Sequence, residues 1–149
     1  MIKSYRHTGI VVNNIRKSEF FYKNLLGLEK VSNIEEGGDY FNSLIQEKNL
    51  KAQVLKVKSK DNVIVEIVQY LDVKRKKIKK PKTMTTVGTA HLCFTVGNIK
   101  KLYNKMKASR VCFFSPPLKS DFDPVSTCFC YDPDYNLVQF VEGKQVSKK

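Results

Sequence analysis

The sequence predicts an α+β fold in which two βαβββ modules follow one another along the chain. The first observation is a repeat, because His7 and His91 each open an apolar strand pattern and are the only histidines. An Asn-Ile-basic-basic run follows each strand, beginning at Asn14 and at Asn98. Both pairs lie 84 positions apart (91 − 7 and 98 − 14). The second observation is that each half closes with an apolar strand that carries Glu or Gln, at Glu66 in the first and Gln139 in the second.

Each half predicts the same order of elements. Asn14 and Asn98 suit the N-cap position of two helices, and Gly27 suits the left-handed end of the first. The first helix is expected to continue to Leu26. Alternating apolar residues and turn signals place the strands. The expected strands are 5–12, 28–32, 52–58 and 63–70 in the first half, and 88–96, 112–114, 126–131 and 137–141 in the second.

The length and composition predict one domain, 1–149, with a first module at about 5–70, a basic linker at 71–87 and a second module at about 88–142. The stretch 35–51, which the second half lacks, is expected to hold a short helix and to shape specificity. No run approaches the roughly 20 apolar residues of a membrane span. The start of the chain is too polar for a signal peptide, so we expect a cytoplasmic protein. The four cysteines are expected to be reduced core residues without a disulfide.

The net charge of +13 and the pI near 9.6 are the unusual bulk properties. The charge is densest in the basic run at 74–82, which is expected to be a solvated linker. Surface solubility is the simplest interpretation. An anionic small-molecule substrate is the next, and nucleic acid comes third because the sequence offers neither a reading helix nor an aromatic platform.

Superposing the halves sets Glu66 against Gln139. Each half therefore begins with a histidine strand and ends with a strand carrying Glu or Gln. Two imidazoles, one carboxylate and one amide oxygen can form a mixed nitrogen and oxygen metal site. Glu66 lies among apolar residues of its strand, where an unpaired carboxylate is costly to bury, and this strengthens the functional interpretation.

The chain resembles the vicinal oxygen chelate superfamily, which contains glyoxalases, bleomycin resistance proteins and extradiol dioxygenases. The motifs that carry the resemblance are His-Thr-Gly-Ile at 7–10, Phe-Tyr-x-x-Leu-Leu-Gly-Leu at 21–28, Val-Glu-Ile at 65–67, the strand at 88–96 and Asp-Pro-Asp-x-Asn at 132–136. The resemblance implies a curved sheet around a central cleft, a homodimer, and four metal ligands. Carried over, these ligands are His7, Glu66, His91 and Gln139, with Gln139 replacing the usual Glu.

The ligand types resemble those of glyoxalase I and methylmalonyl-CoA epimerase most closely. We therefore expect a metal-dependent lyase or isomerase of glyoxalase I-like type that acts on a small carbonyl or thioester substrate. Glu66 is the candidate base, and the ion is divalent Zn, Ni, Co, Mn or Fe. An epimerase would need a further acid, for which the candidates are Asp121, Asp123, Glu35, Glu36 and Asp39.

Two alternatives stay open. A metal-dependent, extradiol-type dioxygenase would need Glu66 to complete its His-His-carboxylate triad. A non-catalytic binding or resistance protein would instead sequester an anionic small molecule.

Overall fold

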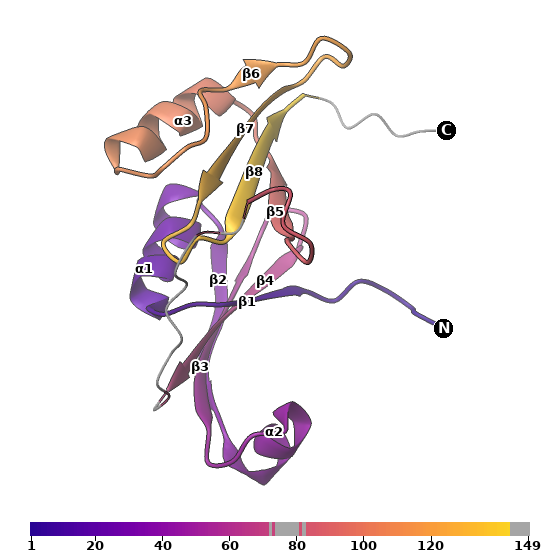
Figure 1. The fold of residues 1–149 in the computed structure, drawn as a ribbon, viewed down its shortest axis with the longest axis vertical. Coiled ribbons are helices and arrows are strands. Elements are labelled where there is room, and N and C mark those ends of the chain that lie inside the picture. The colour runs from indigo at the N-terminus through magenta and orange to yellow at the C-terminus, as the bar shows by residue number, and fades with distance from the viewer. Residues whose placement is uncertain (72, 74–80, 82, 144–149) are drawn as a thin grey trace. The chain divides into compact units, whose positions relative to one another are not determined.

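The computed structural model describes residues 1–71, 73, 81 and 83–143. The chain divides into two compact units, Met1–Lys79 and Lys80–Lys149 (Figure 1). Each unit holds one four-stranded sheet, in the order β1-β4-β3-β2 in the first and β5-β8-β7-β6 in the second. The predicted α+β class with two βαβββ modules is confirmed. The basic run at 74–82 lies outside the described residues, apart from Pro81.

The first unit follows the predicted order of elements. Asn14 caps its helix, because its side-chain oxygen accepts the Lys17 N–H at 3.1 Å, and Gly27 ends it with φ of 79°. The helical stretch is an α-helical turn continued by a π-helix. The elements are β1 Thr8–Val11, α1 Ile15–Glu19, η1 Phe20–Leu25, β2 Glu29–Glu36, α2 Gly38–Ile45, β3 Lys51–Lys58 and β4 Ile64–Leu71.

Strand β2 is longer than the sequence indicated. It pairs with β3 as far as Glu36 opposite Ala52, so the two strands form a long hairpin that ends at α2. Figure 1 shows α2 at the far end of this hairpin. The predicted helix within 35–51 is therefore present, and its role in specificity stays a prediction.

The second unit differs from prediction at its edge strand. The elements are β5 His91–Thr95, α3 Ile99–Ala108, β6 Leu118–Lys119, β7 Ser126–Tyr131 and β8 Leu137–Glu142. The predicted strand at 112–114 is wrong, because this stretch forms only an isolated bridge between Phe113 and Cys130. Pro116 and Pro117 lack the N–H that a ladder needs, so pairing stops there and resumes at β6.

In each unit, an equivalent hydrogen bond joins the first turn of one helix to the last strand of the sheet. The Ile15 N–H donates to Gln69 Oε1 at 2.7 Å, and the Ile99 N–H donates to Glu142 Oε2 at 2.9 Å. These bonds satisfy an orphan donor of the first helical turn. Gln69 and Glu142 therefore have equivalent structural roles in the two modules.

The cores lie between sheet and helix in each unit. Val65 and Ile67 of β4 are buried in the first unit, and Val138 and Phe140 of β8 in the second. The second core also holds two free thiols, Cys128 and Cys130. Burial raises the pKa of Cys128 to about 11 and raises that of Cys130 further. Both thiols are therefore neutral core residues at physiological pH.

The Asp-Pro-Asp-x-Asn motif has a structural role. Asp132 is 4% exposed, and its carboxylate accepts the N–H groups of Asp134 and Asn136 and the Asn136 side-chain amide, at 2.8–2.9 Å. These bonds hold the turn that directs the chain from β7 into β8. The described residues contain no helix long and apolar enough to cross a membrane.

We expect Asp132→Ala to lower the free energy of unfolding by about 2–3 kcal/mol, because it removes the acceptor of three hydrogen bonds in a buried turn. Urea denaturation followed by circular dichroism measures this change. Asp121→Ala, at an exposed loop position, is the control and should change stability by less than ~0.5 kcal/mol. Equal effects of the two variants would contradict the role given to Asp132.

Candidate functional site

The strands next to the predicted site residues pair in the same register in both units. His7 immediately precedes β1, whereas Glu66, His91 and Gln139 lie on strands. In the first unit Gly9 of β1 lies opposite Glu66 of β4, in a parallel pair. In the second, Cys93 of β5 lies opposite Gln139 of β8, also in a parallel pair. Each histidine comes two residues before the residue that faces Glu or Gln. The structure therefore confirms that Glu66 and Gln139 occupy equivalent positions in the repeat.

The first unit brings two of the predicted residues together. His7 Nε2 lies 3.8 Å from Glu66 Oε1. Glu66 alternates with the buried residues Val65 and Ile67, so its side chain lies on the other face of the sheet. The Glu66 side chain is 19% exposed and that of His7 33%, so solvent reaches both groups.

Lys56 is a residue of this cluster that the sequence analysis did not identify. Its Nζ lies 3.0 Å from Glu66 Oε2, the carboxylate oxygen that does not face His7. Lys56 and Glu66 are directly opposite in the antiparallel β3–β4 pair. Lys56 and Glu66 are each five residues from Asp61 in the turn that joins the two strands. A hairpin centred on Asp61 sets them opposite one another, and this spacing is the sequence signal that could have identified Lys56.

The second unit places His91 and Gln139 on adjacent strands. The Gln139 amide nitrogen donates to Thr127 Oγ1 at 3.1 Å. The Thr127 hydroxyl donates its single proton to the Phe140 carbonyl at 2.9 Å, so it can only accept from Gln139. This chain of bonds fixes the amide orientation, so the carbonyl oxygen is the atom of Gln139 that could ligate a metal ion. The His91 ring makes an edge contact with Phe129, with centroids 5.5 Å apart.

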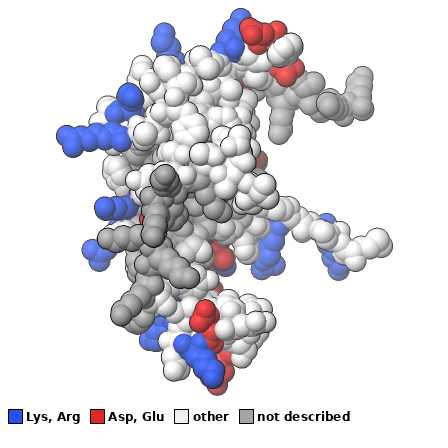
Figure 2. All heavy atoms as spheres, in the orientation of Figure 1, with Lys and Arg blue, Asp and Glu red and all other residues white. Residues whose placement is uncertain are grey.

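The two pairs differ in charge. Glu66 supplies the only carboxylate of the predicted ligand set, and the Lys56 ammonium compensates it. Elsewhere, Lys and Arg side chains are dispersed among uncharged residues on the face shown in Figure 2 rather than joined into one basic patch. Within the described part of the chain, no group of three or more His, Cys, Asp and Glu residues is arranged to hold a metal ion. The four-residue ligand set draws on both units and stays a prediction.

The fold and the repeated strand register define a two-module α+β protein with a histidine at the start of each module. The model of the Glyoxalase/Bleomycin resistance protein/Dioxygenase superfamily matches residues 4–140. The chain therefore belongs to this superfamily. No curated protein matches the sequence significantly.

Solved structures with the same fold share little sequence with this chain. A glyoxalase family protein from Bacillus cereus has a TM-score of 0.86 at 12% identity, over 95% of each chain. One from Enterococcus faecalis has a TM-score of 0.66 at 20% identity, over 94% of this chain and 98% of its own. The fosfomycin resistance protein FosX from Listeria monocytogenes, solved with Mn(II) and sulfate, has a TM-score of 0.64 at 15% identity, over 97% and 95%.

We expect Lys56→Met to strengthen the binding of a divalent cation by about tenfold, because it removes a positive charge next to the Glu66 carboxylate. Isothermal titration calorimetry with Mn(II) and Ni(II) measures the affinity. Lys58→Met is the matched control, since Lys58 lies on the same strand and face and pairs instead with Glu29 at 3.5 Å. Equal metal affinities of the two variants would contradict the idea that the Lys56 ammonium and the metal ion compete for the Glu66 carboxylate.

Proposed function

We propose that this protein is a metal-dependent lyase or isomerase of glyoxalase I-like type, which acts on a small carbonyl or thioester substrate. The observation that carries the proposal is the His7–Glu66 pair, with Nε2 and Oε1 3.8 Å apart. Its residues hold positions equivalent to those of His91 and Gln139 in the second module, because β1 pairs with β4 in the same register as β5 with β8. Membership of the superfamily supports the proposal, as does a protein of the same fold solved with Mn(II).

The donor groups present suit a divalent ion. Metal–nitrogen and metal–oxygen bonds of about 2.0–2.2 Å place neighbouring ligands of one ion ~3–4 Å apart, and the His7–Glu66 separation of 3.8 Å agrees. Gln139 offers a carbonyl oxygen whose amide nitrogen is already bonded to Thr127. His7, Glu66, His91 and Gln139 would hold the ion. When bound, it supplies Lewis-acid polarisation of two neighbouring substrate oxygens.

Glu66 is the proposed base. Its carboxylate can remove the proton next to the substrate carbonyl and return it to the adjacent carbon, so one group performs both transfers. Lys56 holds Oε2 at 3.0 Å and thereby directs Oε1 toward His7. Gln139 cannot accept a proton usefully, so its role is to ligate and orient. A hydrogen shift that needs a single base fits this set better than an epimerisation, which needs groups on two faces.

The substitution of Gln for Glu at 139 has an electrostatic consequence. Glu66 is the one charged donor of the set, and Lys56 compensates that charge. Neutral donors and a partly neutralised carboxylate would hold the ion, so we expect moderate rather than tight affinity. We further propose that the substrate is a small, anionic molecule, in keeping with the net charge of +13. The resemblance implies that the protein functions as a homodimer.

We expect near-stoichiometric transition metal in the wild-type protein after incubation with Ni(II), Zn(II), Mn(II) or Fe(II), and its loss in the His7→Ala/His91→Ala double variant. Elemental mass spectrometry on untagged protein measures the content. Gln139→Glu should tighten binding by about tenfold, because it adds a charged ligand. An absence of metal in both the wild-type and Gln139→Glu proteins would overturn the enzyme proposal and favour a protein that sequesters its ligand.

The role of Glu66 is tested separately. We expect Glu66→Gln to lower turnover of a hemithioacetal by at least about 100-fold, since the base is lost while a carbonyl ligand is kept. Glu29→Gln, an exposed carboxylate of the same sheet, is the control and should keep turnover. Full activity in Glu66→Gln would contradict the assignment of the base.

A further inference from the structure

A chain of aromatic rings begins at His91 and continues across the second sheet. The His91 and Phe129 centroids lie 5.5 Å apart, and those of Phe129 and Phe114 lie 6.3 Å apart. Phe114 lies 4.8 Å from Tyr131, which in turn lies 5.6 Å from Tyr135. Each contact is tilted or edge-on, which is the arrangement that aromatic pairs prefer. These five rings are called the aromatic ladder below.

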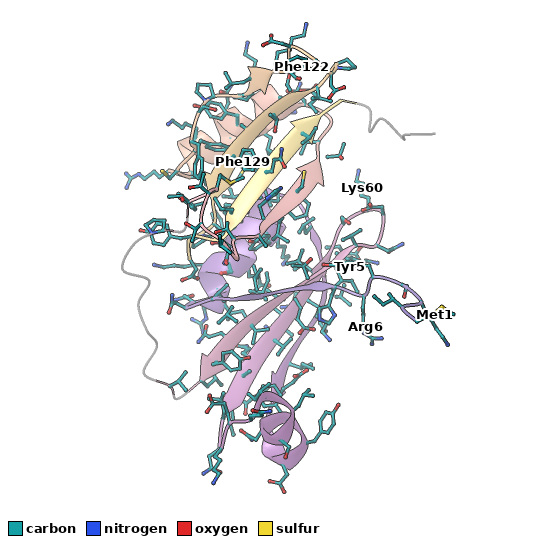
Figure 3. All side chains as sticks on the ribbon, turned by 45° about the vertical axis from the view of Figure 1, so that its right-hand side comes forward. Met1, Tyr5, Arg6, Lys60, Phe122 and Phe129 are labelled. Atoms are coloured by element: carbon teal, nitrogen blue, oxygen red, sulfur yellow. The ribbon has the colours of Figure 1, made fainter. Side chains whose placement is uncertain are left out.

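The ladder lies on the face of the sheet that carries the candidate site. Phe129 is directly opposite Gln139 in the β7–β8 pair, and Tyr131 is opposite Leu137, which is itself opposite His91. Residues directly opposite in a sheet share a face. The ladder therefore shares its face with both predicted ligands of this module. Figure 3 labels Phe129 on β7.

The other face of the same sheet has a separate aromatic cluster that belongs to the core. Phe113 contacts Tyr103 of α3 at 4.7 Å and Phe140 at 6.4 Å. Phe140 is 1% exposed, whereas Phe114 and Tyr135 of the ladder are 46% and 50% exposed. Phe129 and Tyr131, in the middle of the ladder, are half-buried. The ladder lies on the face opposite the core, so packing in the core does not account for the exposure of Phe114 and Tyr135.

We infer that the aromatic ladder is a subsite for a planar aromatic group of the substrate, whose oxygen-bearing end reaches His91 and Gln139. This inference rests on the proposed function and names a substrate class for the same site. Exposed aromatic faces bind planar rings by stacking or edge contact, at about 1 kcal/mol for each pair beyond the burial of area. A few convergent polar groups beside an apolar surface are typical of small-molecule sites.

The size and position of the ladder favour a small molecule over a second protein chain. A stable interface takes about 20–30 residues from each partner, whereas the ladder has five rings and one end of it is the His91 imidazole. A protein covering the ladder would also cover the predicted metal ligand. A small substrate would instead use the rings and the ligand together.

Two probes that differ only in ring saturation test the inference. Phenylglyoxylate and cyclohexylglyoxylate carry the same carbonyl and carboxylate, and the second has a ring without a π face. Ligand-observed NMR titration measures both affinities. It is done once with metal-free protein and once with protein loaded with Zn(II). We expect phenylglyoxylate to bind about tenfold more tightly, as one or two ring contacts would give, and to keep that preference without metal.

Phe114→Leu is the diagnostic variant, because its position is half exposed and Leu keeps the apolar surface. We expect this variant to lose most of the preference for the aromatic probe. Phe122→Leu is the matched control, since Phe122 is 96% exposed on the loop between β6 and β7 and points away from the sheet (Figure 3). The control should keep the wild-type preference.

Three outcomes would overturn the inference. They are equal affinity of the two probes, equal effects of Phe114→Leu and Phe122→Leu, or a change in oligomeric mass in Phe114→Leu with unchanged probe binding. The last outcome would make the ladder an interface between copies. A protein that binds metal but shows no aromatic preference would refute this inference alone. A protein that keeps the preference but binds no metal would refute the proposed function alone.

Discussion

The parallel pairing of the first and last strands in each module is the constraint on which the site depends. It sets Gly9 opposite Glu66 and Cys93 opposite Gln139, and so places a histidine two residues before the partner of Glu or Gln in both units. Side chains alternate along a strand, so a shift of one residue would turn Glu66 into the core and Val65 out of it. The bonds from Ile15 to Gln69 and from Ile99 to Glu142 fix the same strands to their helices.

Electrostatics separates the two modules despite their common geometry. Glu66 lies between an imidazole and the Lys56 ammonium, so its charge is compensated within the first sheet. Gln139 is neutral, and Thr127 orients it through a hydroxyl that donates to the backbone. In the proposed function, Glu66 of the first module would transfer the proton, and Gln139 of the second would supply an uncharged oxygen in a set orientation. Such a site would hold its ion less tightly than one with two carboxylates.

The second sheet shows how one strand can serve two purposes. Cys128 and Cys130 of β7 face the core, while Phe129 between them faces the candidate site. The alternation of β7 therefore separates the aromatic cluster in which Phe113 contacts the buried Phe140 from the ladder that begins at His91. In the proposed subsite, aromatic rings next to the predicted ligands His91 and Gln139 would connect the packing of this sheet to the recognition of a substrate.

The sequence by itself determined the α+β class, the two modules, both helix caps and the equivalence of Glu66 and Gln139, because these follow from local periodicity and from one repeat. It placed the edge strand at 112–114 wrongly, since the prolines that interrupt it act through pairing with β7 rather than through the local pattern. It identified neither Lys56 nor the aromatic ladder. Both are made by residues on different strands, and only the register between strands decides which side chains meet.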